Sequence, residues 1–129
     1  MSGLPGERDL ARLLAGLNVY HHPGDYSFAT QATPPDLQAA IMAFREREGW
    51  TCILLSPDEA EAEARWAWLE ITATSSLHAV GLTAALSNAL TEAGIPCNVV
   101  AAAHHDHIFV PAAEAARAMA AIKALRTGG

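Results

Sequence analysis

Residues 66–125 decide the fold of this chain, and they read WAWLEITATSSLHAVGLTAALSNALTEAGIPCNVVAAAHHDHIFVPAAEAARAMAAIKAL. Apolar residues first alternate with other residues, as in a strand, and then recur at helical spacing. A second strand-like stretch and a second helical stretch follow. The pattern predicts a strand over residues 66–73, a helix over 78–93, strands over 95–102 and 107–110 joined by a turn at His105-Asp106, and a last helix that opens at Pro111.

The first half of the chain carries the same two periods. We expect a helix over residues 7–17, a strand over 25–31 after a Pro23-Gly24 turn, a second helix from the Pro34-Pro35 start to residue 48, a strand over 50–55, and a short helix opened by Ser56-Pro57. The strand over residues 50–55 is apolar on both faces, which is typical of a central strand.

The order strand, helix, strand, strand, helix in the second half is that of a ferredoxin-like α+β sandwich without its final strand. Because the sequence stops soon after the last helix, we predict that a strand of the first half supplies the missing edge. Trp66 and Trp68 lie on the second face of their strand, so that face must also be covered, by another layer or by another chain.

Composition narrows the classes of function. The 129 residues are 51% hydrophobic and 17% charged, enough apolar content for one compact core without disulfides or structural metal. The net charge is −6 and the eight Lys and Arg are not clustered, which argues against nucleic acid and against an anionic membrane surface. Cys52 and Cys97 lie in apolar runs and are expected to be reduced strand residues. No run of 18 apolar residues and no apolar signal core is present, so we expect a cytoplasmic protein.

Residues 66–126 resemble an ACT domain, most closely the regulatory ACT modules of aspartate kinases. The resemblance rests on an ordered series: a strand ending at Thr74, the loop Ser75-Ser76-Leu77-His78, the helix start Ala79-Val80-Gly81, the turn and strand AGIPCNVV of residues 93–100, the hairpin to HDHIFVP, and an alanine-rich last helix. The whole chain is similar to short bacterial proteins with two ACT-like lobes. This implies an incomplete N-terminal lobe over residues 1–63 and an ACT domain over residues 64–129.

The resemblance also implies a non-catalytic regulatory protein that binds a small molecule, an amino acid, without a cofactor. The residues that it implies as the ligand site are Ser75, Ser76, Leu77, His78, Ala79, Val80, Asn98 and Val99. A loop that feeds a helix N-terminus presents free N–H groups to a carboxylate, and Asn98 can both donate and accept toward an α-amino group across a subunit interface. The alternative is that the serines only cap the helix and Asn98 satisfies the strand edge.

The sequence leaves three other hypotheses about function. His104, His105, Asp106 and His107 offer imidazoles and a carboxylate to a zinc or nickel ion, with His21 or His22 as a remote fourth ligand. A structural or partner-docking module without a ligand is the second. An enzyme is the third, although the sequence has no Gly-x-Ser-x-Gly elbow and no phosphate-binding glycine loop. ACT modules usually pair, so the resemblance implies a homodimer, and two tryptophans on a free sheet face would favour one too.

Overall fold

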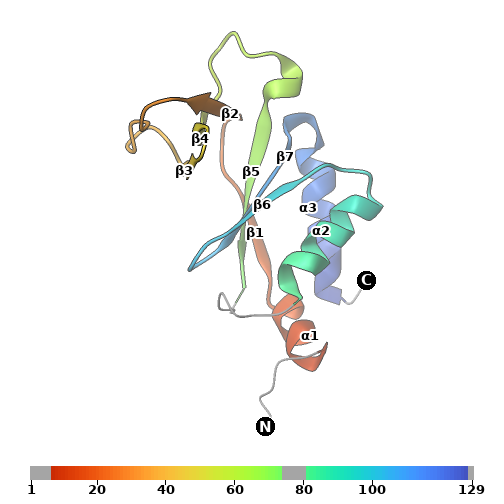
Figure 1. The fold of residues 1–129 in the computed structure, drawn as a ribbon. Helices are drawn as coiled ribbons and strands as arrows, with labels where there is room; N and C mark the ends of the chain where they lie inside the picture. The colour runs from red at the N-terminus through yellow and green to blue at the C-terminus, as the bar shows by residue number, and fades with distance from the viewer. Residues whose placement is uncertain (1–6, 74–80, 128–129) are drawn as a thin grey trace.

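A computed structural model of the chain describes residues 7–73 and 81–127. Its strands and helices form a mixed α/β fold (Figure 1). Its elements are, in order, α1 (Glu7–Ala15), β1 (Asn18–His21), β2 (Tyr26–Gln31), β3 (Met42–Glu46), β4 (Gly49–Leu55), the 3-10 turn η1 (Ala62–Ala64), β5 (Trp66–Thr72), α2 (Leu82–Glu92), β6 (Asn98–Ala101), β7 (Asp106–Pro111), the 3-10 turn η2 (Ala112–Glu114), α3 (Ala115–Ala124) and the 3-10 turn η3 (Leu125–Thr127). Within residues 7–73 and 81–127, no helix has the length and apolar character needed to cross a bilayer.

The strands form one curled antiparallel sheet in the order β3-β4-β2-β5-β7-β6, and β1 also pairs with β5. Strand β1 runs antiparallel to β5, with Asn18 opposite Thr72 and His21 opposite Leu69. The order β1-β5-β7-β6, with α2 after β5 and α3 after β7, is that of a complete ferredoxin-like sheet. The prediction that the first half supplies the missing strand is therefore confirmed, and the strand is β1.

Helices α2 and α3 cover one face of this sheet and enclose the main core (Figure 1). The alternation in β5 turns Ala67, Leu69 and Ile71 toward these helices, where at most 1% of each residue is exposed. The fully apolar stripes of the helices pack against them. The buried members of the main core are Leu17, Ala67, Leu69, Ile71, Leu82, Leu86, Leu90, Ile95, Ile108, Val110, Ala115, Ala118 and Ile122.

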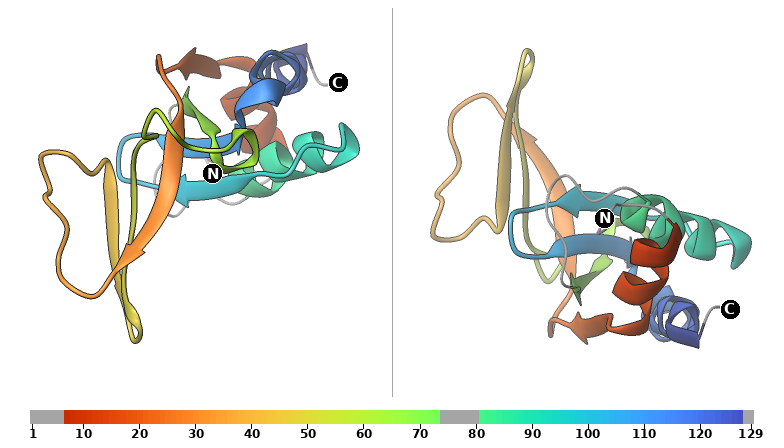
Figure 2. Two further views of the ribbon diagram at one scale, coloured as in Figure 1. Left: turned by 90° about the horizontal axis from the view of Figure 1, so that it is seen from above. Right: turned by 90° about the horizontal axis from the view of Figure 1, so that it is seen from below.

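Strands β2, β3 and β4 form an arm that extends from the α/β body (Figures 1 and 2). The base of the arm lies on the sheet face that carries no helices. There Tyr26 and Ile53 of the arm pack with Phe109 of β7 in a second core. Trp66 and Trp68 are half-buried beside them, so the expected covering layer exists and belongs to the same chain. The argument for a homodimer from two exposed tryptophans is therefore wrong.

The helix predicted from Pro34-Pro35 to residue 48 is wrong, because residues 42–46 form strand β3. Met42 lies opposite Ile53 and Glu46 opposite Gly49 in the β3–β4 hairpin. Leu37, Ile41 and Phe44 recur at a spacing that suits a helix, but hairpin pairing with β4 satisfies the backbone instead and local periodicity gives way to tertiary contact. The helix predicted to open at Ser56-Pro57 is also wrong. Residues 56–61 form no helix, and the 3-10 turn η1 follows at Ala62–Ala64.

The second half agrees with prediction except at element ends. The turn between β6 and β7 lies at Ala103-His104 rather than at His105-Asp106, because Ala101 pairs with Asp106 and the Ala102 N–H donates to the His105 carbonyl. Buried Ile108 and Val110 set this register, since a shift by one residue would turn both out of the main core. Pro111 ends β7, and the last α-helix begins at Ala115.

Candidate functional site

The loop expected to bind a ligand carboxylate, residues 75–80, lies outside the described residues. Its C-terminal flank is Gly81, which has a φ of 98° and precedes the first residue of α2. The Gly81 carbonyl accepts the Ala85 N–H at 2.8 Å, so the helix is hydrogen-bonded from its first turn. A Cβ on Gly81 would lie 3.2 Å from the Leu10 Cδ2 atom, which shows how closely α1 covers this end of the helix.

Asn98 is exposed at the start of β6, and Val99 is half-buried against the main core. Asn98 lies opposite Phe109, and Phe109 lies opposite Trp68. Because β5 and β6 both run antiparallel to β7, Asn98 is level with Trp68, about 13 Å along β5 from Thr72, where the loop side of the strand begins. Within one chain, Asn98 therefore lies well away from the end of β5 that leads to the loop.

The sheet face without helices carries a regular pattern of aromatic and polar side chains. Successive rows across β6, β7, β5 and the β1 edge are Asn98-Phe109-Trp68-His22, then Val100-His107-Glu70-Tyr20, then Ala102-His105-Thr72-Asn18. Phe109 and Trp68 of the first row and Val100 of the second row belong to the second core or pack against it. The topology thus brings histidines that are more than 80 residues apart in sequence onto one surface.

Glu70 joins this surface through its carboxylate. The His22 Nε2 atom lies 2.8 Å from Glu70 Oε1, and the His105 Nε2 atom lies 3.4 Å from Glu70 Oε2. His107 completes a group that we call the histidine cluster: His22, Glu70, His105 and His107. The hydrogen bond from His22, followed by the nearby imidazoles, lowers the pKa of the Glu70 carboxyl, although burial opposes the shift.

Trp68 connects the histidine cluster to the second core. Its indole N–H donates to His107 Nδ1 at 2.9 Å. The His22 ring stacks on Trp68 with ring centroids 3.5 Å apart, and Tyr26 meets Trp68 edge-on at 5.4 Å. Because an indole N–H can only donate, His107 Nδ1 must be unprotonated, which places the proton of the neutral ring on Nε2. Burial, the largest cause, lowers the pKa of His107.

Sequence reasoning named His22, His105 and His107 only as metal ligands and missed Glu70. The signal was available, because Glu70 follows Trp66 and Trp68 on the second face of an alternating strand. Across residues 7–73 and 81–127, no three His, Cys, Asp or Glu side chains are arranged to hold a metal ion. The imidazoles of His104 and His105 have their centroids 6.4 Å apart.

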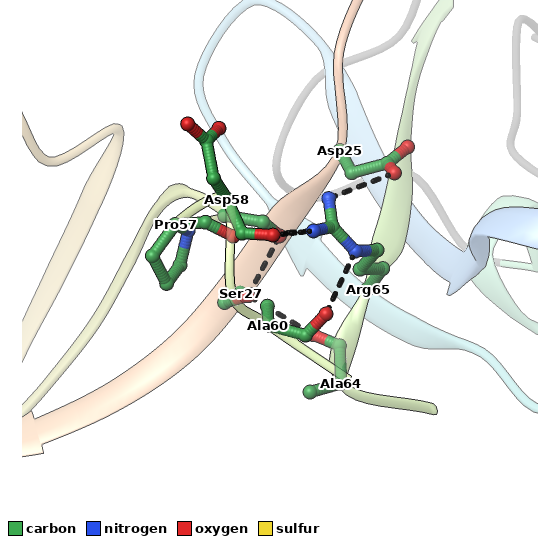
Figure 3. A network of polar contacts seen from close by, with 8 residues as sticks. Asp25, Ser27, Pro57, Asp58, Ala60, Ala64 and Arg65 are labelled. Carbon is green, nitrogen blue, oxygen red and sulfur yellow. Dashed lines mark hydrogen bonds and ion pairs between the residues drawn. The ribbon is translucent and has the colours of Figure 1, made fainter. Parts of the chain in front are cut away.

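A second polar network surrounds Arg65, immediately before β5 (Figure 3). Its guanidinium donates to the Pro57 carbonyl at 3.2 Å and to the Asp58 carbonyl at 3.0 Å, and its Nε donates to the Ala60 carbonyl at 3.2 Å. The Asp25 carboxylate lies 3.4 Å away. Arg65 thus takes up carbonyls that a helix would have used, which explains why residues 56–61 follow an irregular path between the arm and β5.

Arg65→Lys should lower the free energy of unfolding by about 1–2 kcal/mol, because an ammonium group cannot reach the same fork of carbonyl acceptors. Urea unfolding followed by circular dichroism measures this. The control is Arg45→Lys on the exposed side of β3, which should stay within about 0.5 kcal/mol of the parent. Equal stability of the two variants would show that the Arg65 network contributes nothing.

A shallow pocket of about 220 Å³ lies on the arm, where β2 ends beside the β3–β4 hairpin. Its lining residues are Thr30, Gln31, Ala32, Glu46, Glu48, Gly49, Trp50 and Thr51. Most of these are exposed, and Thr51 satisfies Glu46 by a hydrogen bond. The carboxylates there, Glu46 at the end of β3 and Glu48 in the hairpin turn, are exposed, so the pocket has no features of a built site.

Comparison with known proteins agrees with this architecture. Models of the ACT domain match residues 5–65 and, with a different ACT model, residues 61–124. A crystal structure of a Vibrio cholerae protein of unknown function, described as a possible transport protein, is 34% identical; the match covers 92% of this chain and 97% of that one, with a TM-score of 0.79.

An Agrobacterium tumefaciens protein shares the fold at 14% identity, with a TM-score of 0.69 over 85% of this chain and 89% of its own. No curated protein gives a significant match. ACT domains in general are regulatory modules that bind small molecules and are not catalytic. With two ACT matches end to end and the strand order of a ferredoxin-like sheet, the chain belongs to the ACT-domain family and consists of two ACT-like lobes.

Proposed function

We propose that this protein is a cytoplasmic, non-catalytic sensor that binds an amino acid or a similar small molecule between two copies of the chain. The observation that carries the proposal is the position of Asn98, exposed on the edge strand β6 about 13 Å along the sheet from the loop flank at Thr72. In this proposal, Asn98 of one copy and residues 75–80 of the other act on one ligand. The division into lobes at residues 1–63 and 64–129 belongs to the same proposal.

The chemistry of this site follows from its two halves. The backbone N–H groups that open α2 would hold a ligand carboxylate, helped by the Ser75 and Ser76 hydroxyls. The Asn98 side chain of the partner copy would hold the α-amino group, and Val99 beneath it keeps that strand anchored in the main core. Ligand binding would then favour the dimer by as much as it binds the paired state better than the single one.

A thermal-shift screen of the untagged protein against the twenty amino acids tests this. A ligand at one hundred times its Kd should add about 2.7 kcal/mol of stability. Asn98→Ala should weaken the binding of that ligand about tenfold to a hundredfold, because a hydrogen bond to a charged amino group contributes about 1.5–3 kcal/mol. The matched control is Asn88→Ala on the exposed side of α2, which should bind as the parent does. Unchanged affinity in Asn98→Ala would contradict the assigned site.

A partner-docking role is the second candidate, and the arm favours it. Of the large hydrophobic residues that are exposed in the described chain, only Tyr20 lies outside the arm and its connecting loops. The others are Phe28, Leu37, Ile41, Phe44 and Leu55. Such an apolar surface is typical of a contact between proteins. A flat thermal response to every amino acid, with a stable dimer in light scattering, would support docking over sensing.

A further inference from the structure

The His107–Trp68 hydrogen bond lies where the arm meets the α/β body. On one side, His107 belongs to β7 of the α/β body, and on the other, the Trp68 ring meets Tyr26 of the arm edge-on at 5.4 Å. Strand β2 pairs with β5 only through Tyr26 and Trp66. Side-chain packing joins the arm to the body instead, in the second core, where Tyr26, Ile53 and Phe109 are buried, and at Phe28, whose ring lies edge-on to Phe109.

The bond requires one protonation state. Trp68 Nε1 donates, so His107 Nδ1 must offer a lone pair, and a proton on that nitrogen would set two N–H groups against each other at 2.9 Å. The Trp68 ring is also fixed on both sides, by the stacked His22 ring and by Phe109 with its centroid 6.2 Å away. To find a new acceptor the indole would have to turn out of this stack, and its contact with Tyr26 would be lost.

We propose that His107 and Trp68 form an acid-sensitive latch, in which protonation of His107 Nδ1 releases the Trp68 indole and loosens the arm from the α/β body. The proton comes from solvent and binds the free lone pair of Nδ1, and no covalent bond is broken. The latch is independent of the ligand site proposed above, because Asn98 takes no part in it.

The charged and titratable groups around His107 come from β5, from β7 and its hairpin, and from the β1 edge, whereas β6 places Val100 opposite it. Glu70 on β5 and the neighbouring Asp106 raise the pKa of His107, whereas His105 on the hairpin and His22 at the β1 edge lower it, and burial, which also lowers it, is the largest cause. Burial raises the pKa of Tyr26 on β2 above its usual value of 10, so this phenol stays neutral in the range where His107 titrates. Since the folded-state pKa of His107 is depressed, its contribution to stability is complete above about pH 6.5 and is lost as the pH falls toward the lowered value.

Two carboxylates lie near His107, Glu70 and Asp106. The pKa of Glu70 is lowered from 4.5, so the carboxylate keeps its charge throughout the range in which His107 titrates above pH 5. Burial raises the pKa of Asp106, whose side chain lies on the strand position next to His107 and therefore on the opposite face of β7. Asp106→Asn removes that titration while leaving the His107–Trp68 pair intact.

Nuclear magnetic resonance between pH 7.5 and 5.0 tests the latch in the full chain. The Trp68 indole cross-peak, assigned with Trp68→Phe, should move with the same midpoint as the His107 ring carbons. Amide protection of β4 around Ile53, corrected for intrinsic exchange, should fall about tenfold over the same range. In His107→Gln, whose amide oxygen accepts the indole proton without titrating, both responses should disappear. His21→Gln, an exposed histidine of β1, and Asp106→Asn should keep them.

Three results would overturn the latch. The Trp68 indole peak could stay fixed while His107 titrates, or it could move equally in His107→Gln. It could also move while the amide protection of β4 is unchanged, which would mean that breaking the hydrogen bond does not loosen the arm. The comparison of midpoints uses the parent protein alone, so the test stands even if His107→Gln does not fold. Loss of amino-acid binding in Asn98→Ala is a separate readout, and failure of the sensor proposal leaves this one untouched.

Discussion

Ile53→Ala should lower the free energy of unfolding by about 2–5 kcal/mol, the usual cost of removing three carbons from a fully buried isoleucine. Ile53 is 0% exposed although it belongs to the arm, and it packs in the second core with Tyr26 and Phe109. The alanine would leave a cavity between the arm and the sheet, where the rigid aromatic rings around it cannot collapse. Equilibrium unfolding in urea, monitored by circular dichroism, measures the loss.

The control for this variant is the same change at Ile41, which is 38% exposed at the start of the β3 hairpin. Because much of that side chain already meets water, Ile41→Ala should cost less than about 1 kcal/mol. Hydrogen exchange adds a second readout, since amides of β2 and β4 should lose protection in Ile53→Ala before those of β5 and β7. Equal losses of unfolding free energy in the two isoleucine variants would show that the second core does not hold the arm to the α/β body.

Gly49→Ala should destabilise the protein by about 2–4 kcal/mol through backbone strain together with a steric clash. Gly49 has a φ of 139°, a conformation that L residues with a side chain rarely adopt. A Cβ there would also lie 2.9 Å from the Gln31 carbonyl oxygen at the end of β2. Neither atom can move without separating β2 from β4, so thermal unfolding should begin in the arm.

Gly16→Ala is the matched control for that substitution. Gly16 follows α1, its φ is not positive, and the nearest atom to an added Cβ is the Arg12 carbonyl oxygen at 3.8 Å. Alanine should therefore be neutral there, or stabilising by about 0.4–1 kcal/mol through a less flexible unfolded chain. A loss at Gly16 as large as that at Gly49 would mean that the strain argument is wrong.

Much of the α/β body could be predicted because its interactions are local and periodic. The alternation of residues 66–73 and the helical stripe that ends at Gly94 agree with β5 and α2 to within a few residues. The prediction of a helix from Pro34-Pro35 to residue 48 was wrong because strand β3 is stabilised by its pairing with β4, which the local sequence pattern does not show. The turn of the last hairpin was displaced because buried Ile108 and Val110 determine the register, and a local turn preference is weaker than core burial.

The candidate sites divide in the same way. The ACT resemblance and the residues that carry it could be read directly from the sequence, and the family matches agree with it. The sequence could not show that Asn98 lies about 13 Å along the sheet from the flank of the loop, because this depends on the relative direction of β5 and β6. Nor could the sequence show that His22 and His105 both lie beside the Glu70 carboxylate.

By itself, the sequence determined the fold class, the family and the need for a borrowed strand, because hydrophobic period and residue order are properties of the chain. Only the tertiary structure decided which strand is borrowed, how the arm covers the two tryptophans, and which histidines meet Glu70. Those features depend on contacts between residues far apart in the chain. Such contacts form only when burial of apolar surface repays the entropy of bringing the segments together.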